Sequence, residues 1–341
     1  MCWEIPMKSR EIVQRTLEYT GPERVARTFP NAVLGGSDFA GSSCTARTYA
    51  TPWSSLGQGR WERLDEWGNT WGRIDTTSKG EVVKGVLANW DDLENYRFPD
   101  YSKVSDYDSV RIQREAEPDL WLIGNLPGFT FNIARKMRKF DQYLMDILLE
   151  PERIAILHDR VDAVIETMIV NYAKAGVDSV MFPEDWGTQN NTLINPKLWY
   201  TMFFPRFQKL CATAHEYGVK VFMHSCGQIE PIVPGLIEAG IDLLQFDQPD
   251  LHGIDVLAGH QKNARITFWC PVDIQITLQT CDKAVIQNKA REMLDKLWNG
   301  RGGFIAGYYS DNPSIGLDPK WQRYACDIFT TYGKQTYYTG T

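Results

Sequence analysis

A histidine and a cysteine stand two positions apart at the end of an apolar run. The run, VKVFMHSCG, covers residues 219–227 and ends in His224, Ser225, Cys226 and Gly227. A buried strand holds its backbone stiff, so we expect the imidazole and the thiol to be presented together where the strand ends. Imidazole nitrogen and cysteine sulfur are ligands that bind zinc and similar metals. The pattern therefore predicts a metal site.

Charge and hydropathy exclude several classes of partner. The chain has 341 residues, with 36 Lys and Arg against 43 Asp and Glu, giving a net charge of -7. Because it has no basic stripe interleaved with aromatic residues, we expect no nucleic-acid partner. The apolar runs are far shorter than the roughly 20 residues that span a bilayer, and residues 1–14 lack a hydrophobic signal core. We therefore expect a cytoplasmic protein without a membrane partner.

The seven cysteines are odd in number and irregularly spaced. They occupy positions 2, 44, 211, 226, 270, 281 and 326. Without a secretion signal, this pattern favours free thiols and metal ligands over a disulfide framework.

Helical and strand patterns alternate along the chain. An N-terminal helix is predicted over 8–19, a strand over 24–34, and a peripheral β-hairpin over 60–75 that turns at Gly68 and Asn69. Further strands are predicted over 119–126, 178–182, 219–224, 241–246, 265–270 and 303–308, and helices over 131–149, 151–175, 196–217, 231–239, 254–258, 282–298 and 320–331.

This alternation with short loops predicts parallel strands covered by helices. About seven or eight such units form a closed (β/α)8 TIM barrel, and no linker or repeat divides residues 1–341, so we expect a single domain. An open doubly wound sheet is the alternative, but the chain lacks the Gly-rich phosphate turn of that fold.

In a barrel of this kind the active site lies on the loops that follow the carboxyl ends of the strands. Polar residues that could bind a metal, transfer a proton or contact a substrate recur at these predicted positions. They are Asp38, Asn125, Glu184, Asp185, His224, Cys226, Asp247, Gln248, Cys270, Asp273 and the run from Tyr308 to Asp311.

Several segments resemble a known family. They are MFPEDWGTQNNTLINPKLW, FPRFQKLCATAHEYGVKVFMHSCGQIEPIVPGLIEAGIDLLQFDQ, RITFWCPVDIQ and RGGFIAGYY. Together with KSREIVQRTLEYTGPERV and ANWDDLENYRFPD, they are similar to the uroporphyrinogen decarboxylase superfamily, which also contains cobamide-dependent methyltransferases. The resemblance spans nearly the whole chain and implies a (β/α)8 barrel with its active site at the carboxyl ends of the strands.

The resemblance points to the methyltransferase branch. Decarboxylases of porphyrins carry an Arg-rich stretch of the type PVWxMRQAGR, whereas this chain has TFPNAVLGGSDFAGSS. Without bidentate Arg partners the carboxylates of a tetrapyrrole would be poorly bound. His224 and Cys226 resemble the zinc motif of the methyltransferases, but the third Cys expected after GGFIAG is replaced by Tyr308 and the residues that follow it.

We expect Cys270 to supply the missing zinc ligand. With His224 and Cys226 it would leave a fourth position open, as in catalytic zinc sites. A zinc-bound thiol loses its proton and becomes the nucleophile that takes a methyl group from methyl-cobalt. Glu184 is the alternative ligand, or else it acts with Asp185 as a general base and as an orienter of the ligands.

Further residues are candidates for contact with the substrate. Trp186 and Trp269 are expected to wall a cavity, and Asn125, Gln189 and Tyr308 are expected to orient a polar substrate. The segment from residue 250 to 253, DLHG, departs from the DxHxxG box that binds cobalamin through its histidine. We therefore expect the cobamide to be carried by a separate corrinoid protein.

Two functions remain open. The first is a zinc-dependent methyltransferase that moves a methyl group between a corrinoid protein and a small acceptor, such as coenzyme M or tetrahydrofolate. The second is a metal-free decarboxylase of a carboxylated small molecule, with Asp38, Glu184 and Tyr308 as its polar set. The resemblance implies a monomer or a homodimer in either case.

Overall fold

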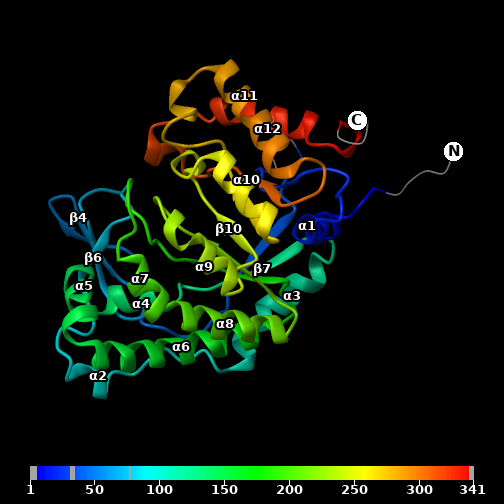
Figure 1. The fold of residues 1–341 in the computed structure, drawn as a ribbon. Helices are drawn as coiled ribbons and strands as arrows, with labels where there is room; N and C mark the ends of the chain where they lie inside the picture. The colour runs from blue at the N-terminus through cyan, green and yellow to red at the C-terminus, as the bar shows by residue number, and fades with distance from the viewer. Residues whose placement is uncertain (1–5, 31–34, 77, 338–341) are drawn as a thin grey trace.

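Eight parallel strands form the centre of the molecule. The structure, a computed structural model, describes residues 6–30, 35–76 and 78–337. Its strands pair in the order β1-β12-β11-β10-β9-β8-β7-β2, and the sheet curls into a nearly closed barrel. Helices follow the later strands and surround the barrel (Figure 1), whereas β1 leads to β2 without a helix among the described residues. The predicted (β/α)8 barrel is therefore confirmed.

The barrel strands are short. They are β1 (Ala26–Arg27), β2 (Phe39–Ser42), β7 (Trp121–Asn125), β8 (Ser179–Pro183), β9 (Lys220–His224), β10 (Leu243–Gln245), β11 (Thr267–Cys270) and β12 (Phe304–Ala306).

The helices occupy most of the predicted ranges. They are α1 (Ser9–Glu18), α2 (Asp92–Asn95), α3 (Asp108–Ala116), α4 (Thr130–Met137), α5 (Phe140–Leu149), α6 (Pro151–Lys174), α7 (Pro196–Met202), α8 (Phe204–Glu216), α9 (Val233–Glu238), α10 (Ile254–Asn263), α11 (Lys283–Met293) and α12 (Lys320–Tyr332). Within the described ranges, no helix has the length and apolar character needed to cross a bilayer.

A second, antiparallel sheet lies beside the barrel. It consists of β3 (Ser54–Gly57), β4 (Arg60–Leu64), β5 (Thr70–Arg73) and β6 (Glu81–Lys84). The pair β4 and β5 is the predicted hairpin, which is confirmed but belongs to a larger sheet. Lys136 of α4 places its Nζ 5.5 Å from the centre of the Trp71 ring and so links this sheet to the barrel.

Two predicted helices are each divided in two. The range 131–149 breaks where Lys139 adopts a left-handed φ of 63°, which ends α4 before α5 begins. The range 196–217 divides at Phe203, and Pro205 then lies in the first turn of α8, where its lack of an N–H costs nothing. The strand predicted over 24–34 contracts to β1, and residues 31–34 lie outside the described residues.

Strand β2 is missing from the prediction, and its presence moves Asp38 away from the rim. The sequence of β2, FAGS, lacks the β-branched residues that identify strands. Because β2 runs parallel to β7, Asp38 lies at its amino end. The Asp38 carboxylate accepts hydrogen bonds from the Ser9 hydroxyl at 2.6 Å and from the Arg24 guanidinium at 2.6 and 2.8 Å. The structure therefore places Asp38 at the amino end of the barrel, where it holds α1, and not at the rim where its catalytic role was expected.

Alternation along the strands decides which side chains reach the barrel interior. Phe222 of β9 and Leu243 of β10 belong to one buried cluster, which also includes residues of β2, β7 and β12. Their neighbours Val221 and Leu244 belong to the larger cluster beneath the helices. Since successive side chains of a strand point to opposite faces, residues in step with Phe222 and Leu243 point inward at the rim.

Candidate metal centre

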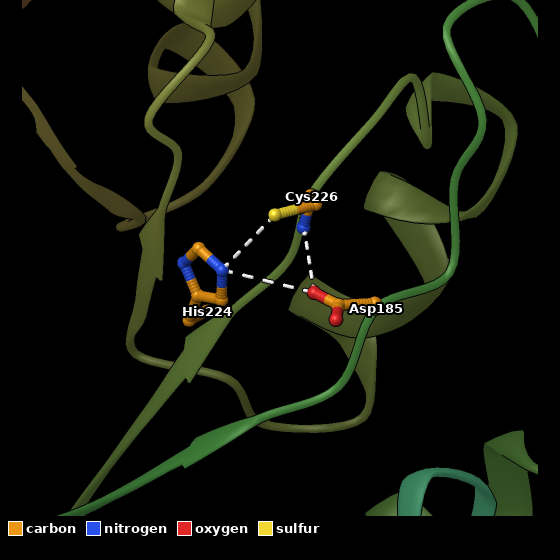
Figure 2. A group of neighbouring side chains, drawn as sticks. All are labelled: Asp185, His224 and Cys226. Atoms are coloured by element: carbon orange, nitrogen blue, oxygen red, sulfur yellow. Dashed lines mark hydrogen bonds and ion pairs between the residues drawn. The ribbon is translucent and has the colours of Figure 1, made fainter. Parts of the chain in front are cut away.

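Asp185, His224 and Cys226 bring three potential ligand atoms together at the carboxyl ends of β8 and β9. These atoms all lie within 4.8 Å of one another, and no other such group of three occurs in the described part of the chain. The Cys226 Sγ lies 3.3 Å from the His224 Nε2, which in turn lies 3.7 Å from the Asp185 Oδ1 (Figure 2). The predicted pairing of His224 with Cys226 is thus present, with a carboxylate beside it.

The backbone at the end of β9 explains this arrangement. His224 is the last residue of β9 and is in step with Phe222, so its ring points toward the barrel mouth. The Nδ1 atom of that ring forms a hydrogen bond with the Oε1 of Gln245 on β10, the residue that pairs with His224 in the sheet. The backbone N–H of Cys226 donates to the Asp185 Oδ1 at 3.0 Å.

Two glycines allow the loops after β8 and β9 to touch. Gly227 has a φ of +78°, and a Cβ atom placed on it would lie 2.4 Å from the backbone carbon of Gly187. Next to this contact, the Gln228 N–H donates to the Thr188 carbonyl oxygen at 2.7 Å. Only residues without a Cβ permit so close an approach. The glycine contact therefore brings Asp185 to Cys226.

Burial and nearby acidic groups keep the Cys226 thiol protonated in the absence of a cation. Burial is the main cause that raises the pKa of Cys226 to about 12, and the charges of Asp185 and Asp247 raise it further. Arg135 offsets part of this negative charge, since its Nη2 lies 3.6 Å from the Asp185 Oδ2. A bound cation would reverse the balance, because metal coordination favours the thiolate.

The donor set fits a zinc ion. One imidazole nitrogen, one thiol sulfur and one carboxylate oxygen are ligands that zinc takes in proteins. Ligands about 2.0 to 2.3 Å from a tetrahedral ion lie roughly 3.3 to 3.7 Å apart. The separations of 3.3 Å and 3.7 Å in this group agree with that geometry.

Cys270 does not join the group. It lies at the end of β11 with its side chain fully buried in the cluster beneath the helices, together with Phe268. Its neighbour Trp269 packs instead against the interior cluster, so the two side chains point to opposite faces of the strand. The structure therefore does not bring Cys270 to His224 and Cys226, contrary to its expected place as third ligand, and Asp185 lies beside that pair instead.

Glu184 stabilises a helix terminus. Its carboxylate accepts hydrogen bonds from the backbone N–H groups of Phe129, Phe131 and Asn132, at 3.0, 2.9 and 3.2 Å. These groups open α4, whose N-cap residue Phe129 has no side chain able to cap it. Burial raises the pKa of Glu184 to about 7, although the three N–H donors lower it. Glu184 does not belong to the group of three potential ligand residues, so the structure does not bring it to the place that was expected for an alternative ligand.

Replacing Glu184 with glutamine is expected to destabilise the fold by about 1 to 3 kcal/mol. The new amide has only one acceptor oxygen, so at least one buried N–H at the start of α4 loses its partner. Chemical unfolding in urea measures the change, and Glu115→Gln on an exposed position of α3 is the control. Equal stability of the two variants would contradict the capping role.

Trp186 lies in the core and does not line an open cavity. Its side chain is fully buried, and its ring stacks on Phe131 with centroids 4.0 Å apart. The structure therefore places Trp186 in the core behind the site, and not at the wall of a cavity where it was expected. Gln189 lies exposed on the loop after β8, and Asn125 lies exposed at the end of β7, where its amide donates to the Ser43 hydroxyl at 3.3 Å.

Trp269 forms an aromatic surface inside the barrel mouth. Its half-buried ring stacks on Phe39 with centroids 5.5 Å apart, and its Nε1 donates to the Thr28 hydroxyl at 3.1 Å. Tyr308 is also half-buried, and its hydroxyl accepts a hydrogen bond from Asn312 at 3.3 Å. Both residues remain candidates for contact with a substrate.

Sequence reasoning missed Gln245 and Gly187. Gln245 is in step with Leu243, so the alternation of β10 would have placed it inside the barrel beside His224. Gly187 gave no local signal, because its importance comes from a contact with Gly227, which is 40 positions away in the chain.

Comparison with known proteins is consistent with this fold. The model of the family "Uroporphyrinogen decarboxylase (URO-D)" matches residues 74–313. No curated protein matches the chain. Among solved structures, a methyltransferase from Methanosarcina mazei is similar with a TM-score of 0.64 and 13% sequence identity, over 96% of this chain and 99% of that chain.

Two more distant structures have lower similarity. A B12-independent methionine synthase from Shewanella sp. W3-18-1 has 11% identity and a TM-score of 0.42, over 77% of this chain and 70% of that chain. An endo-beta-1,4-xylanase from Gloeophyllum trabeum has 13% identity and a TM-score of 0.41, over 69% of this chain and 81% of that chain.

Proposed function

The chain belongs to the uroporphyrinogen decarboxylase family, and from this premise we propose that it is a zinc-dependent methyltransferase. It would move a methyl group between a corrinoid protein and a small acceptor such as coenzyme M or tetrahydrofolate. The observation that supports the proposal is the convergence of Asp185, His224 and Cys226 at the barrel rim. The methyltransferase similar in fold lends support at the level of architecture.

The proposed mechanism assigns holding and positioning roles to the chain's residues. Asp185, His224 and Cys226 would hold zinc and leave a fourth position for the acceptor. Zinc bound there would favour the deprotonated form of a thiol acceptor and so supply a nucleophile near neutral pH. Trp269 would form one wall of the barrel mouth beside the acceptor, and the partner protein would supply the cobamide.

The electron pairs of the bonds formed and broken balance in a methyl transfer of this kind. When bound, the corrinoid partner would supply a methyl group whose bonding electron pair stays with cobalt, and the acceptor would provide the electron pair of the new bond to carbon. The chain's task is then to hold the acceptor atom in line with that bond, because positioning contributes much of the barrier lowering in such displacements.

The metal-free decarboxylase has less support. Two residues of its expected polar set, Asp38 and Glu184, serve the amino end of the barrel and the start of α4. Asp38 is therefore separated from Tyr308, which follows β12 at the carboxyl end of the barrel. Since a decarboxylase must gather its polar groups around the leaving carboxylate, this separation favours the methyltransferase.

The test is metal analysis joined to an assay of methyl transfer. Protein purified from zinc-replete cells should carry close to one zinc per chain and should transfer methyl groups from methylcobalamin to a thiol or to tetrahydrofolate. Treatment with a chelator should abolish the transfer, and zinc should restore it. A metal-free protein that releases carbon dioxide from a carboxylated compound would refute the proposal.

Replacing Asp185 with asparagine is expected to weaken zinc binding by at least the roughly ten- to hundredfold that the loss of an outer partner of a ligand costs. The amide lacks the negative charge that attracts the cation. Competition with a zinc chelator measures the change. The comparison is Cys270→Ala, which removes a thiol pointing beneath the helices and should leave zinc affinity unaltered. A stronger effect of the Cys270 change would restore Cys270 as a ligand.

A further inference from the structure

Gln245 connects His224 to a carboxylate. The Gln245 Oε1 meets the His224 Nδ1, and the Gln245 Nε2 donates to the Asp247 Oδ1 at 2.9 Å. Gln245 is almost fully buried, so its amide cannot exchange either contact freely for water. The three side chains therefore form one chain of hydrogen bonds that runs from the rim of β10 to the imidazole.

Asp247 decides which way the amide of Gln245 faces. An ionised carboxylate can only accept hydrogen bonds, so the group turned toward Asp247 must be the NH2 of the amide. The amide oxygen is then directed at His224. A carbonyl oxygen also only accepts, which means that the His224 Nδ1 must carry the proton of the neutral ring.

The other nitrogen of the ring is consequently left with its lone pair. That atom, Nε2, lies 3.3 Å from the Cys226 Sγ and 3.7 Å from the Asp185 Oδ1. If the amide of Gln245 were reversed, its NH2 would face Nδ1, and the proton would move to Nε2. A protonated Nε2 cannot bind a metal.

We infer that Asp247 and Gln245 are positioning residues that hold His224 in the tautomer able to bind a metal at Nε2. This inference deepens the proposed function and rests on it for the role of the metal. Neither residue needs to touch the ion. The Asp247 carboxylate fixes the orientation of the Gln245 amide, and this amide fixes which nitrogen of the His224 ring carries the proton.

A second contact supports the same loop from β10. The Gly227 N–H donates to the Gln248 Oε1 at 3.3 Å. The segment from residue 245 to 248 thus contacts the ring of His224 and the backbone that follows Cys226. This segment contacts His224 and the backbone after Cys226 from the side of β10. Asp185 contacts Cys226 from the opposite side, in the loop after β8.

The experiment reads the tautomer directly by nitrogen NMR of the metal-free chain labelled at histidine. The chain contains only five histidines, and a His224→Gln spectrum identifies the signal in question. We expect the neutral wild-type ring of His224 to carry its proton on Nδ1. In Asp247→Asn the new amide can donate as well as accept, so the Gln245 amide should turn and a mixture of tautomers should appear, with zinc affinity ten- to a hundredfold lower.

A charge-neutral exchange provides the decisive comparison. The double variant Gln245→Glu with Asp247→Asn places the carboxylate directly beside His224, where it can only accept from Nδ1. It should restore the Nδ1-protonated ring and recover most of the zinc affinity. Asp119→Asn, an exposed carboxylate near the amino end of the barrel, is the control for loss of charge alone.

Either of two results would overturn the inference: a wild-type His224 protonated at Nε2, or an Asp247→Asn ring whose tautomer is unchanged. Because the spectra are recorded without metal, they decide this point whether or not the wild-type chain binds zinc. Failure of wild-type zinc binding would instead refute the proposed function.

Discussion

Replacing Cys226 with serine is expected to leave the chain almost free of zinc and to abolish methyl transfer. The thiolate is the softest donor of the group, and a serine hydroxyl stays protonated near neutral pH and binds zinc poorly. We expect the zinc affinity to fall by about a thousandfold. The free energy lost in this way is only part of the total free energy with which structural sites bind zinc. Metal analysis after dialysis and chelator competition measure the loss.

Cys44 offers a matched control for this change. It is also a half-buried cysteine, and it follows β2 on the same rim, but it is not part of the ligand group. Cys44→Ser should retain zinc and methyl transfer. If both serine variants kept their zinc, the metal would have to lie elsewhere; if both lost it, general damage to the rim would explain the result better than ligation.

Replacing Gly227 with alanine should have the largest effect on the scaffold of the site. The added Cβ would lie 2.4 Å from the Gly187 backbone and 2.6 Å from the Thr188 carbonyl oxygen, so the two loops must separate. We expect a loss of about 3 kcal/mol in the free energy of unfolding, from the positive φ and the overpacking together. Zinc affinity should fall as well, because Asp185 moves away from Cys226.

Gly218 allows the two causes to be separated. Its φ of +72° is close to that of Gly227, but a Cβ placed on it has no atom within 4 Å. Gly218→Ala should therefore cost only the conformational share, about 1 kcal/mol, and leave zinc affinity unchanged. Urea unfolding of both variants in the presence of chelator gives the comparison. Equal losses would show that contact with Gly187 contributes nothing.

Much of the barrel follows from local sequence. The strand before His224 and the strand before Glu184 are predicted almost residue by residue, because continuous apolar runs between helical patterns leave few alternatives. The breaks near Lys139 and Phe203 were not predicted, since a left-handed residue or a change of helix direction hardly alters the period of apolar residues. Strand β2 was not predicted because its four residues are too few and too weakly apolar to form a recognisable strand pattern.

The pairing of His224 with Cys226 was determined by the sequence, because two positions at a strand end cannot be separated by any folding of the rest. The third member was decided by tertiary structure. Cys270 and Trp269 are adjacent on one strand, so only one of them can face the barrel interior. In the register that β11 adopts, Trp269 faces the interior and Cys270 faces the helices. Asp185 reaches the site because two glycines far apart in the chain touch, and such a contact leaves no trace in local sequence.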